Sequence, residues 1–495
     1  MLHYIKLHLL PYATAFVMAL YAGSLMPARA QYQNVKEETR KGNRPLAEFA
    51  AQQNTLFNFG WKFCLVTKEN KNTDFASPTL DDSSWRTLDL PHDFQFEQPW
   101  TKSGGGARGF KPMCDGWYRK TFRTDSLWQG MRVSLDFGGI IYYGDVYING
   151  HKVASTDYGY VGLEADVTKH LRYDADNVVA VYASTGPKKG SRWYTGGGLF
   201  RDVTLVVTDA RQYFTRHPLY ITTPSVSERE ATVKIEAELA CYLKIKDLSV
   251  GVAIKDAAGA TVYEAKKVIP FNRGQKINEH LIDSITLTAP KLWSCETPHL
   301  YTAEVTLLRP DGTVADRVSE HFGVRSIEYS PEFGFKLNGK KVIFKGIANH
   351  HTLGALGAAA YPRAMEKRIQ LLKEYGFNHV RTSHNPYSKS FLDLCDKYGM
   401  LVVDELYDKW LTQFAGGRTE WVNLWQQDVP EFIRRDRNHP SVVMWSLGNE
   451  LQTYWNLPYA DWGVTPYRLQ RELLHRYDKT RPVTVAMHPR GRSQQ

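Results

Sequence analysis

Cysteine is scarce in this sequence, and no cysteine lies in a metal-binding or disulfide pattern. No C-x-x-C and no Cys/His ligand spacing occurs. An odd number of widely separated cysteines argues against a disulfide framework and against a structural zinc site. We therefore predict that most of the thiols are buried. The five cysteines are Cys64, Cys114, Cys241, Cys295 and Cys395.

Long apolar runs are also missing, apart from one near the start of the chain. Residues 9–20 are mostly apolar, which is short of the ~20 residues that a membrane-spanning helix needs. Lys6 is the only charge before this stretch, and Ala28-Arg29-Ala30 after it matches an A-x-A cleavage site. These features predict a signal peptide over residues 1–30, no membrane span, and a mature chain that is periplasmic or secreted.

Positive charge is spread thinly, with no run of five or more basic residues. The formal net charge is +10, and residues 1–30 hold Lys6 and Arg29 but no acid, so the mature chain carries 10 − 2 = +8. Scattered basic residues are typical of a solvated surface, and we predict no nucleic-acid partner. Two glycine triplets, at 104–106 and 196–198, match no phosphate-binding loop and are predicted to form tight or flexible loops.

The first half of the mature chain carries the pattern of β-strands. From Trp61 to Thr208, short alternating segments are separated by Gly, Asn and Asp. The clearest is residues 144–153, a hairpin expected to turn at Asn149-Gly150. This pattern predicts a jelly-roll β-sandwich over residues 31–210.

The pattern of short strands continues to about residue 330. Residues 231–239 alternate cleanly between apolar and polar side chains. Strands of this length and spacing predict an immunoglobulin-like β-sandwich over residues 211–330, without the disulfide of that fold.

After residue 330, strands alternate with amphipathic helices, which is typical of a parallel sheet and predicts a (β/α) barrel. A closed barrel of eight strands takes ~250 residues, so we interpret residues 331–495 as an incomplete (β/α)8 TIM barrel. The whole fold is then multidomain, β followed by α/β. The five expected strands are 344–348, 378–382, 400–404, 442–446 and 482–486, and the four expected helices are 362–375, 388–398, 421–437 and 464–478.

The stretch from Asp436 to Glu450 holds the main candidate chemistry. Its apolar run, residues 442–445, predicts a strand that is buried on both faces and ends in Ser-Leu-Gly-Asn-Glu. Asn449 and Glu450 would therefore follow the C-terminal end of a barrel strand, the edge at which barrel enzymes carry their active sites. In isolation, an Asn-Glu pair is more often a capped strand with a solvated glutamate.

Several motifs together resemble glycoside hydrolase family 2, and most of all its bacterial β-galactosidases. Each motif is modest, but their common order and spacing across nearly the whole mature chain argue against chance. The family combines a jelly-roll domain, an immunoglobulin-like domain and a barrel in a retaining glycosidase. The motifs are Leu90-Pro91-His92-Asp93-Phe94, Gly116-Trp117-Tyr118, Ser191-Arg192-Trp193-Tyr194, Asn349-His350-His351, the segment 354–359, Arg381-Thr382-Ser383-His384-Asn385-Pro386, Val402-Val403-Asp404-Glu405 and the segment 438–450.

The resemblance implies that Glu450 is the general acid/base and that Asn449 hydrogen-bonds the 2-hydroxyl of the sugar. A leaving group is protonated by a carboxylic acid that stays neutral near the working pH, and an apolar wall raises a carboxyl pKa. We expect Trp445 to provide such a wall of the sugar pocket. A 2-hydroxyl contact that tightens in the transition state adds to the rate.

The resemblance also implies that His384 and the pair His350/His351 line the pocket for the terminal sugar, with His351 slightly favoured over His350. Arg381 is expected to support the site by pairing with a carboxylate, Glu450 or another. We expect only a supporting role for Asp404-Glu405 at the end of a strand. His439 is favoured as a turn residue over a catalyst.

Retaining hydrolysis needs a second carboxylate ~5 Å from the first, and in the family this nucleophile lies on a later strand. The acids after Glu450 are Asp461, Glu472 and Asp478, and none is expected to end a barrel strand. We therefore interpret the chain as ending before the strands that carry the nucleophile.

The favoured hypothesis is an exported, exo-acting, retaining hydrolase of β-galactosidase type that removes terminal β-linked galactose from glycans, impaired in this chain because the nucleophile is missing. β-Glucuronidase or β-mannosidase specificity is the nearest alternative, and residues 354–359 favour the galactosidase. A non-catalytic carbohydrate-binding fragment is the second hypothesis. Some relatives use Mg²⁺ or Na⁺ near the site, and either ion stays open here, but the sequence shows no ligand cluster and no cofactor is assigned. A homo-oligomer fits the full-length form.

Overall fold

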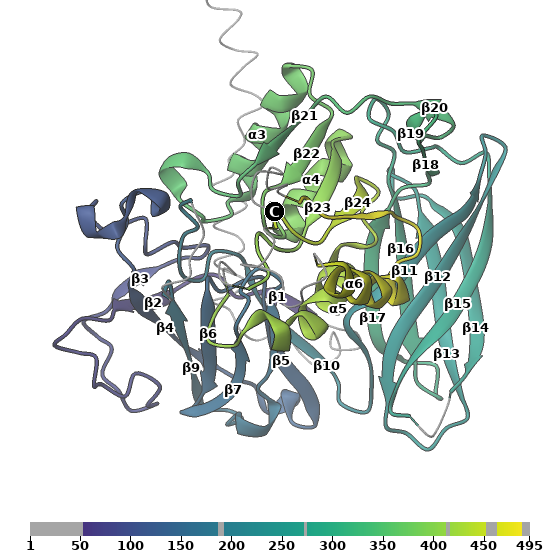
Figure 1. Ribbon diagram of the computed structural model, residues 1–495. Coiled ribbons are helices and arrows are strands. Elements are labelled where there is room, and N and C mark those ends of the chain that lie inside the picture. Colours follow the sequence, from purple (N-terminus) through teal and green to yellow (C-terminus); the bar gives the residue numbers. More distant parts are fainter. Residues whose placement is uncertain (1–52, 187–192, 272–274, 412–415, 452–462, 488–495) are drawn as a thin grey trace, which may run out of the picture. The chain divides into compact units, whose positions relative to one another are not determined.

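The structure, a computed structural model, describes residues 53–186, 193–271, 275–411, 416–451 and 463–487 (Figure 1). The predicted signal peptide lies outside the described residues. So do Ser191-Arg192, Asp461 and the end of the chain from residue 488. No helix in the described part of the chain is long and apolar enough to cross a membrane.

The first part of the chain forms a β-sandwich of two antiparallel sheets, as predicted. Apolar side chains of both sheets make one core, for example Trp61 and Tyr118 from one sheet and Leu135 from the other. The predicted hairpin is confirmed: its strands pair across Asn149-Gly150, whose φ angles of 50° and 85° are those a two-residue turn needs. One sheet has the order β1 (Gln53–Leu56), β10 (Val203–Asp209), β5 (Met131–Phe137), β8 (Leu163–Asp166); the other has β3 (Arg86–Leu88), β2 (Trp61–Leu65), β4 (Asp115–Arg123), β9 (Asp176–Ser184), β6 (Tyr143–Ile148), β7 (His151–Thr156).

A second antiparallel sandwich follows, again as predicted. The alternating segment 231–239 lies in one of its strands, whose buried and partly exposed residues alternate. Cys241, Cys295 and Cys395 are buried, Cys64 and Cys114 are partly buried, and none forms a disulfide. One sheet has the order β11 (Gln212–Val226), β12 (Glu230–Cys241), β15 (Ile277–Thr288); the other has β14 (Thr261–Pro270), β13 (Asp247–Lys255), β16 (Tyr301–Leu308), β17 (Val314–Phe322).

The last part is a small hairpin sheet followed by a five-stranded parallel sheet whose strands are ordered as in the sequence, which is the arrangement of a barrel wall (Figure 1). The hairpin sheet comprises β18 (Ile327–Ser330), β19 (Gly334–Leu337) and β20 (Lys340–Lys341). The parallel strands are β21 (Gly346–Asn349), β22 (His379–Thr382), β23 (Leu401–Glu405), β24 (Val442–Ser446) and β25 (Val483–Thr484), and the helices between them are α3 (Pro362–Glu374), α4 (Lys389–Tyr398), α5 (Trp425–Asp436) and α6 (Val464–Tyr477).

Local sequence explains the ends of these helices. α4 begins after Ser388, whose Oγ accepts a hydrogen bond from the backbone N–H of Phe391 at 3.2 Å, and ends at Gly399 in the left-handed conformation. α5 begins at Trp425, four residues later than predicted, because residues 421–423 form a separate 3-10 turn. The capping residues Ser388 and Gly399 therefore explain the bounds of α4.

The first sandwich and the barrel share one core. Tyr158, Tyr160 and Phe200 of the sandwich pack in the same cluster as Leu406 and Tyr407 after β23. Polar contacts accompany this packing: Arg201 Nη2 donates to Pro386 O at 2.7 Å, and Ala358 N donates to Asp93 Oδ2 at 2.7 Å. The sandwich thereby holds the loops that follow β21 and β22.

Candidate active site

Glu405, the last residue of β23, is the centre of a polar cluster at the C-terminal edge of the parallel sheet. Its side chain is 0% exposed, and its Oε2 accepts hydrogen bonds from Arg381 Nη2 at 2.6 Å and from Ser446 Oγ at 2.6 Å. Its Oε1 lies 2.5 Å from His384 Nδ1. Glu405 therefore joins the ends of β22, β23 and β24. Arg381 was expected to pair with Glu450 or with another carboxylate, and the structure shows that its partner is Glu405.

Asn449 is oriented from two sides. Its Oδ1 accepts from Arg381 Nη2 at 3.0 Å, and its Nδ2 donates to Asp408 Oδ1 at 2.9 Å. The backbone N–H of Asn449 also donates to Asp408 O at 2.8 Å. An amide whose oxygen faces a guanidinium and whose nitrogen faces a carboxylate has one assigned orientation, so a ligand would meet a preorganised carboxamide.

Glu450 has the opposite environment to Glu405. Its side chain is 44% exposed, and Lys409 Nζ lies 3.9 Å from its Oε2. Its φ of 44° places it in the left-handed region, which a residue with a side chain adopts only when its surroundings hold it there. Backbone hydrogen bonds of Gly448 O and Leu451 N with Ala486 flank it. Glu450 is thus the accessible carboxylate beside a buried polar cluster.

Aromatic rings lie on the other side of the cluster. Trp193, from the first sandwich, stacks on His350 with ring centroids 4.5 Å apart, and its ring centroid lies 5.3 Å from that of His384 in an edge-to-face arrangement. His350 and His384 are 5.8 Å apart in an edge-to-face arrangement. His350 Nδ1 lies 3.0 Å from Ser383 O. Predicted residues His350 and His384 are therefore brought together, with Trp193 as a further member.

His351 does not share this position, which corrects the preference for it over His350. It is buried at the contact between the first sandwich and the barrel, where its Nε2 lies 3.0 Å from Thr195 O. Its ring packs against Tyr160 and Phe200. Burial, and then the charge of Arg201, lowers the pKa of His351 to about 3. Both histidines lie in the loop after β21, and their rings contact different partners: His350 stacks on Trp193, whereas His351 packs against Tyr160 and Phe200.

Trp445 also departs from its predicted place. It is completely buried, its Nε1 donates to Asp478 Oδ2 at 2.9 Å, and its ring meets that of Phe432 on α5. The next residue, Ser446, points toward Glu405. Trp445 therefore lies on the helix side of the sheet and does not line a pocket beside Glu450.

Asp404, which precedes Glu405 in β23, is held by Thr382, the last residue of β22. Thr382 Oγ1 donates to Asp404 Oδ1 at 3.0 Å and accepts from the backbone N–H of Glu405 at 2.8 Å. Burial, and then the charge of Asp436, raises the pKa of the Asp404 carboxyl well above its usual range. A buried carboxyl group that is hydrogen-bonded to Thr382 fits the predicted supporting role.

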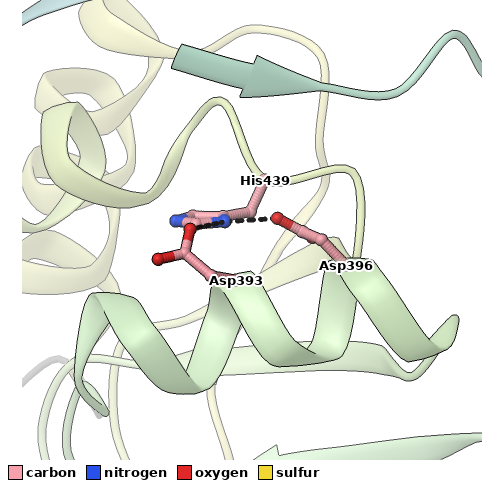
Figure 2. Close-up of side chains that lie close together, drawn as sticks. All are labelled: Asp393, Asp396 and His439. Atoms are coloured by element: carbon pink, nitrogen blue, oxygen red, sulfur yellow. Dashed lines mark hydrogen bonds and ion pairs between the residues drawn. The ribbon is translucent and has the colours of Figure 1, made fainter. Parts of the chain in front are cut away.

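The one set of three metal-ligand residues in the described part of the chain lies elsewhere. Figure 2 shows Asp393 and Asp396 projecting from α4 toward His439, which precedes β24. His439 Nδ1 lies 2.5 Å from Asp396 Oδ2, and Lys389 Nζ lies 2.9 Å from Asp393. Burial opposes protonation of His439, but the charge and hydrogen bond of Asp396 outweigh it and raise its pKa. Cations already pair with both aspartates, so the cluster fits an ion-pair tie between α4 and the turn better than a metal site.

Sequence reasoning missed several members of the site. Trp193 is 157 positions before His350 in the chain, and no local pattern links them. Asp408 and Lys409 lie in the loop after β23 and carry no motif. Glu405 was expected only to support the site, and the structure places it at the centre of the cluster, where it contacts Arg381, His384 and Ser446.

The carboxylates near these strand ends differ in their exposure to solvent. Asp404, Glu405 and Asp408 are buried, and Glu405 is engaged by Arg381, His384 and Ser446. A buried, fully engaged carboxylate cannot approach a sugar. Among the described residues at the ends of β21 to β25, Glu450 is therefore the carboxylate placed to exchange a proton with a ligand.

Three family models match consecutive parts of the chain. "Glycosyl hydrolase 2 galactose-binding domain-like" matches residues 112–221, "Glycosyl hydrolases family 2" matches residues 219–325, and "Glycosyl hydrolases family 2, TIM barrel domain" matches residues 332–492. These models follow the same order as the two sandwiches and the parallel sheet.

Individual relatives agree with the family models. A β-galactosidase of Bacteroides ovatus is 36% identical over 413 residues, which are 82% of this chain and 47% of the relative. A β-glucuronidase of Bacteroides fragilis is 28% identical over 463 residues, 89% of this chain and 62% of the relative. The crystal structure of a glycosyl hydrolase family 2 member from Bacteroides cellulosilyticus aligns with a TM-score of 0.81 at 34% identity, covering 88% of this chain and 56% of that one. The chain spans about half the length of these relatives, and it belongs to glycoside hydrolase family 2.

Proposed function

We propose that this protein is a retaining, exo-acting hydrolase of β-galactosidase type that cleaves terminal β-linked galactose from glycans. The observation that carries the proposal is the Asn449–Glu450 turn, in which an accessible carboxylate follows a carboxamide of assigned orientation at the end of β24. A carboxylic acid there can protonate the leaving oxygen, and the amide can contact a sugar hydroxyl.

The nucleophile of this mechanism is a second carboxylate on the opposite face of the sugar, ~5 Å from the acid. Glu405 does not serve, because it is buried and engaged by three side chains. We propose that the nucleophile is provided by sequence beyond β25. The steps attributed to the described residues are binding, orientation and proton transfer.

The cations of the site favour a neutral sugar over a glucuronide. Recognition of a sugar carboxylate needs a cation that it can pair with. Arg381 already pairs with Glu405 at 2.6 Å, and Lys409 already pairs with Asp408 at 2.8 Å. The β-glucuronidase alternative rests on relatives that carry that name, and it would require a cation from another part of the protein.

The test is hydrolysis of aryl β-galactoside, β-glucuronide and β-mannoside by the protein with any coding sequence after Gln495 retained. We expect the β-galactoside to have the highest kcat/KM. Glu450→Ala should lower kcat/KM for a 4-nitrophenyl galactoside by about 100- to 10,000-fold, the usual contribution of a general acid. A 2,4-dinitrophenyl galactoside, whose leaving group needs little protonation, should lose much less, and azide should restore turnover.

A matched control and two contrary results sharpen this test. Glu472→Gln changes an exposed glutamate on α6 and should leave kcat/KM unchanged. A preference for the glucuronide would overturn the proposed specificity. Equal losses for both leaving groups in Glu450→Ala would overturn the acid/base role of Glu450.

We also propose that the protein is exported and acts without a metal cofactor. N-terminal sequencing of exported protein should then begin near Gln31, and an intact Met1 would overturn the export proposal. Dialysis against EDTA should leave kcat/KM unchanged, and a loss restored by Mg²⁺ would overturn the proposal on the metal.

A further inference from the structure

Lys409 is a lysine buried beneath the proposed acid/base. Its side chain is 0% exposed, and its Nζ donates to Asp408 Oδ1 at 2.8 Å and to the backbone carbonyl of Asn449 at 2.7 Å. We infer that Lys409, together with Asp408, is a positioning residue that holds the Asn449–Glu450 turn in its catalytic geometry, an inference that rests on the proposed role of Glu450.

Burial makes the contacts of Lys409 specific. A charged lysine is rarely removed from water unless its ammonium is paired and hydrogen-bonded. Here one carboxylate, which is also buried, and one backbone carbonyl receive it. The ammonium therefore cannot move without breaking its hydrogen bonds to Asp408 and to Asn449 O, and these bonds tie the turn to the loop after β23.

The hydrogen bond to Asn449 O acts on the peptide that leads into Glu450. Glu450 has a φ of 44°, a conformation that ordinary side chains disfavour. Lys409 binds the carbonyl of the preceding peptide, and Asp408 O binds the N–H of Asn449. These contacts act on the two successive peptides that lead into Glu450, Gly448–Asn449 and Asn449–Glu450, and so on the direction in which the Glu450 carboxylate leaves the backbone.

Asp408 connects Lys409 to the carboxamide of Asn449. Its Oδ1 receives both Lys409 Nζ and Asn449 Nδ2. The lysine therefore holds in place the carboxylate that orients the Asn449 amide. One buried ion pair thus positions the two side chains proposed to contact the sugar.

Lys409 also acts on Glu450 through charge. Its Nζ lies 3.9 Å from Glu450 Oε2, a distance at which a cation favours the ionised carboxylate. Other charged groups also surround the turn, and they contribute to the pH dependence of activity that a Lys409 variant would show. Those that the structure describes are Asp408 from the loop after β23, Glu405 at the end of β23, Arg381 on β22 and His384 in the turn after β22.

The first variant to test is Lys409→Met in the whole protein. We expect kcat/KM for an aryl β-galactoside to fall by about 100-fold, because small displacements of a catalytic group cost this much. The alkaline limb of the pH profile should move up by about one unit, since the lost cation no longer favours ionised Glu450. A merely structural role would not move that limb.

Two further variants keep the test decisive. Asp408→Asn with Lys409→Met removes both buried charges, so the protein keeps no unpaired charge if the single variant fails to fold. This double variant should also lose activity. Lys389→Met is the matched control, because Lys389 pairs with Asp393 on α4 at 2.9 Å, and it should change neither activity nor the pH limb.

The outcomes separate this inference from the proposed function. A double variant with full activity, or Lys409→Met with unchanged kcat/KM, would overturn the positioning role, and an unmoved alkaline limb in Lys409→Met would overturn the effect of its charge on Glu450. If the unmodified protein hydrolyses no aryl glycoside, the proposed function fails and hydrogen exchange decides the positioning role. Peptides over residues 446–451 should then exchange at least about tenfold faster in Lys409→Met than in Lys389→Met, and equal exchange would overturn it.

Discussion

Glu405 ends β23 and Glu450 follows the neighbouring strand β24, and their environments indicate different roles: a structural ion pair for Glu405 and contact with a ligand for Glu450. Glu405 is sealed beneath Arg381, His384 and Ser446, whereas Glu450 is exposed. Removing one partner of a buried ion pair lowers the stability of the fold strongly, because the remaining charge is left unpaired in a medium of low polarity. Glu405 should therefore matter for stability as well as for the site.

Glu405→Gln should lower the free energy of unfolding by about 3 kcal/mol, because it leaves the Arg381 guanidinium uncompensated. Urea unfolding followed by fluorescence measures this loss. Glu431→Gln is the matched control: Glu431 also pairs with an arginine at 2.6 Å, but its side chain is 40% exposed, and the expected loss is about 0.5 kcal/mol. Equal losses in the two variants would contradict the role of burial.

The Trp193–His350 stack offers a flat aromatic surface beside His384. Trp193→Ala should raise KM for an aryl β-galactoside about fivefold while kcat changes little, because an aromatic contact contributes roughly 1 kcal/mol to binding. Steady-state kinetics separate the two constants. Trp100→Ala, which removes an exposed tryptophan of the same sandwich, serves as control. A fall confined to kcat in Trp193→Ala would argue against a binding role.

The loop between β23 and α5 connects the site to the first sandwich. It carries Asp408 and Lys409 near its start and Arg418 further along. The Arg418 guanidinium donates to Asp145 on β6 at 2.8 and 2.9 Å and to Asp157 at 3.2 Å. The loop is therefore attached at one end to the strand that carries Glu405 and, further along, to the sandwich.

Arg418→Met should lower kcat/KM by roughly tenfold, because a loosened loop holds Asp408 and Lys409 less precisely. Arg434→Met removes another contact between domains, the 2.6 Å pair of Arg434 with Glu238, on a helix that carries no site residue. Kinetics and thermal unfolding should be measured on both. Equal kinetic losses would show that domain contact in general, and not this loop, supports activity.

At the scale of the whole molecule, the contact between the first sandwich and the barrel completes the site. Trp193 comes from the sandwich and His350 from the loop after β21, and they stack because the two domains share a core. His351 lies within that shared core as a neutral imidazole. Its protonation should therefore weaken the contact between the domains.

The folded protein should lose stability as the pH falls below about 6.5, because the pKa of His351 is about 3 in the folded state and about 6.5 in the unfolded state. Between these values the unfolded chain binds the extra proton, so acid favours unfolding. Replacing His351 by Phe should reduce the difference in unfolding free energy between pH 7 and pH 4.5 by about 2 kcal/mol. Urea titrations at the two pH values measure it.

His439→Gln is a control in which the pH dependence of stability should change in the opposite direction. Asp396 raises the pKa of His439, so the stability from this pair is present below about 6.5 and is lost as the pH rises through the folded value. His439→Gln should therefore cost more stability at pH 6 than at pH 9. An unchanged pH dependence in His351→Phe would contradict the assigned burial of that imidazole.

Local elements were predictable where one physical signal dominated. The apolar runs near 401 and 442 became β23 and β24, and helix 388–398 matched α4 because Ser388 and Gly399 cap it. Side-chain direction was not predictable. β24 is buried on both faces, so apolar and polar residues do not alternate, and nothing in the run distinguishes the direction of Trp445 from that of Ser446.

The sequence by itself determined the order of sandwich, sandwich and parallel sheet, and it placed Asn449 and Glu450 at a strand end. Periodicity, turn residues and caps act over a few neighbours, and each is written in the chain locally. Only the tertiary structure decided that His350 and not His351 faces the site, that Trp193 joins it, and that Lys409 lies beneath Glu450. These are contacts between residues distant in the chain, and they arise from how whole domains and strands pack.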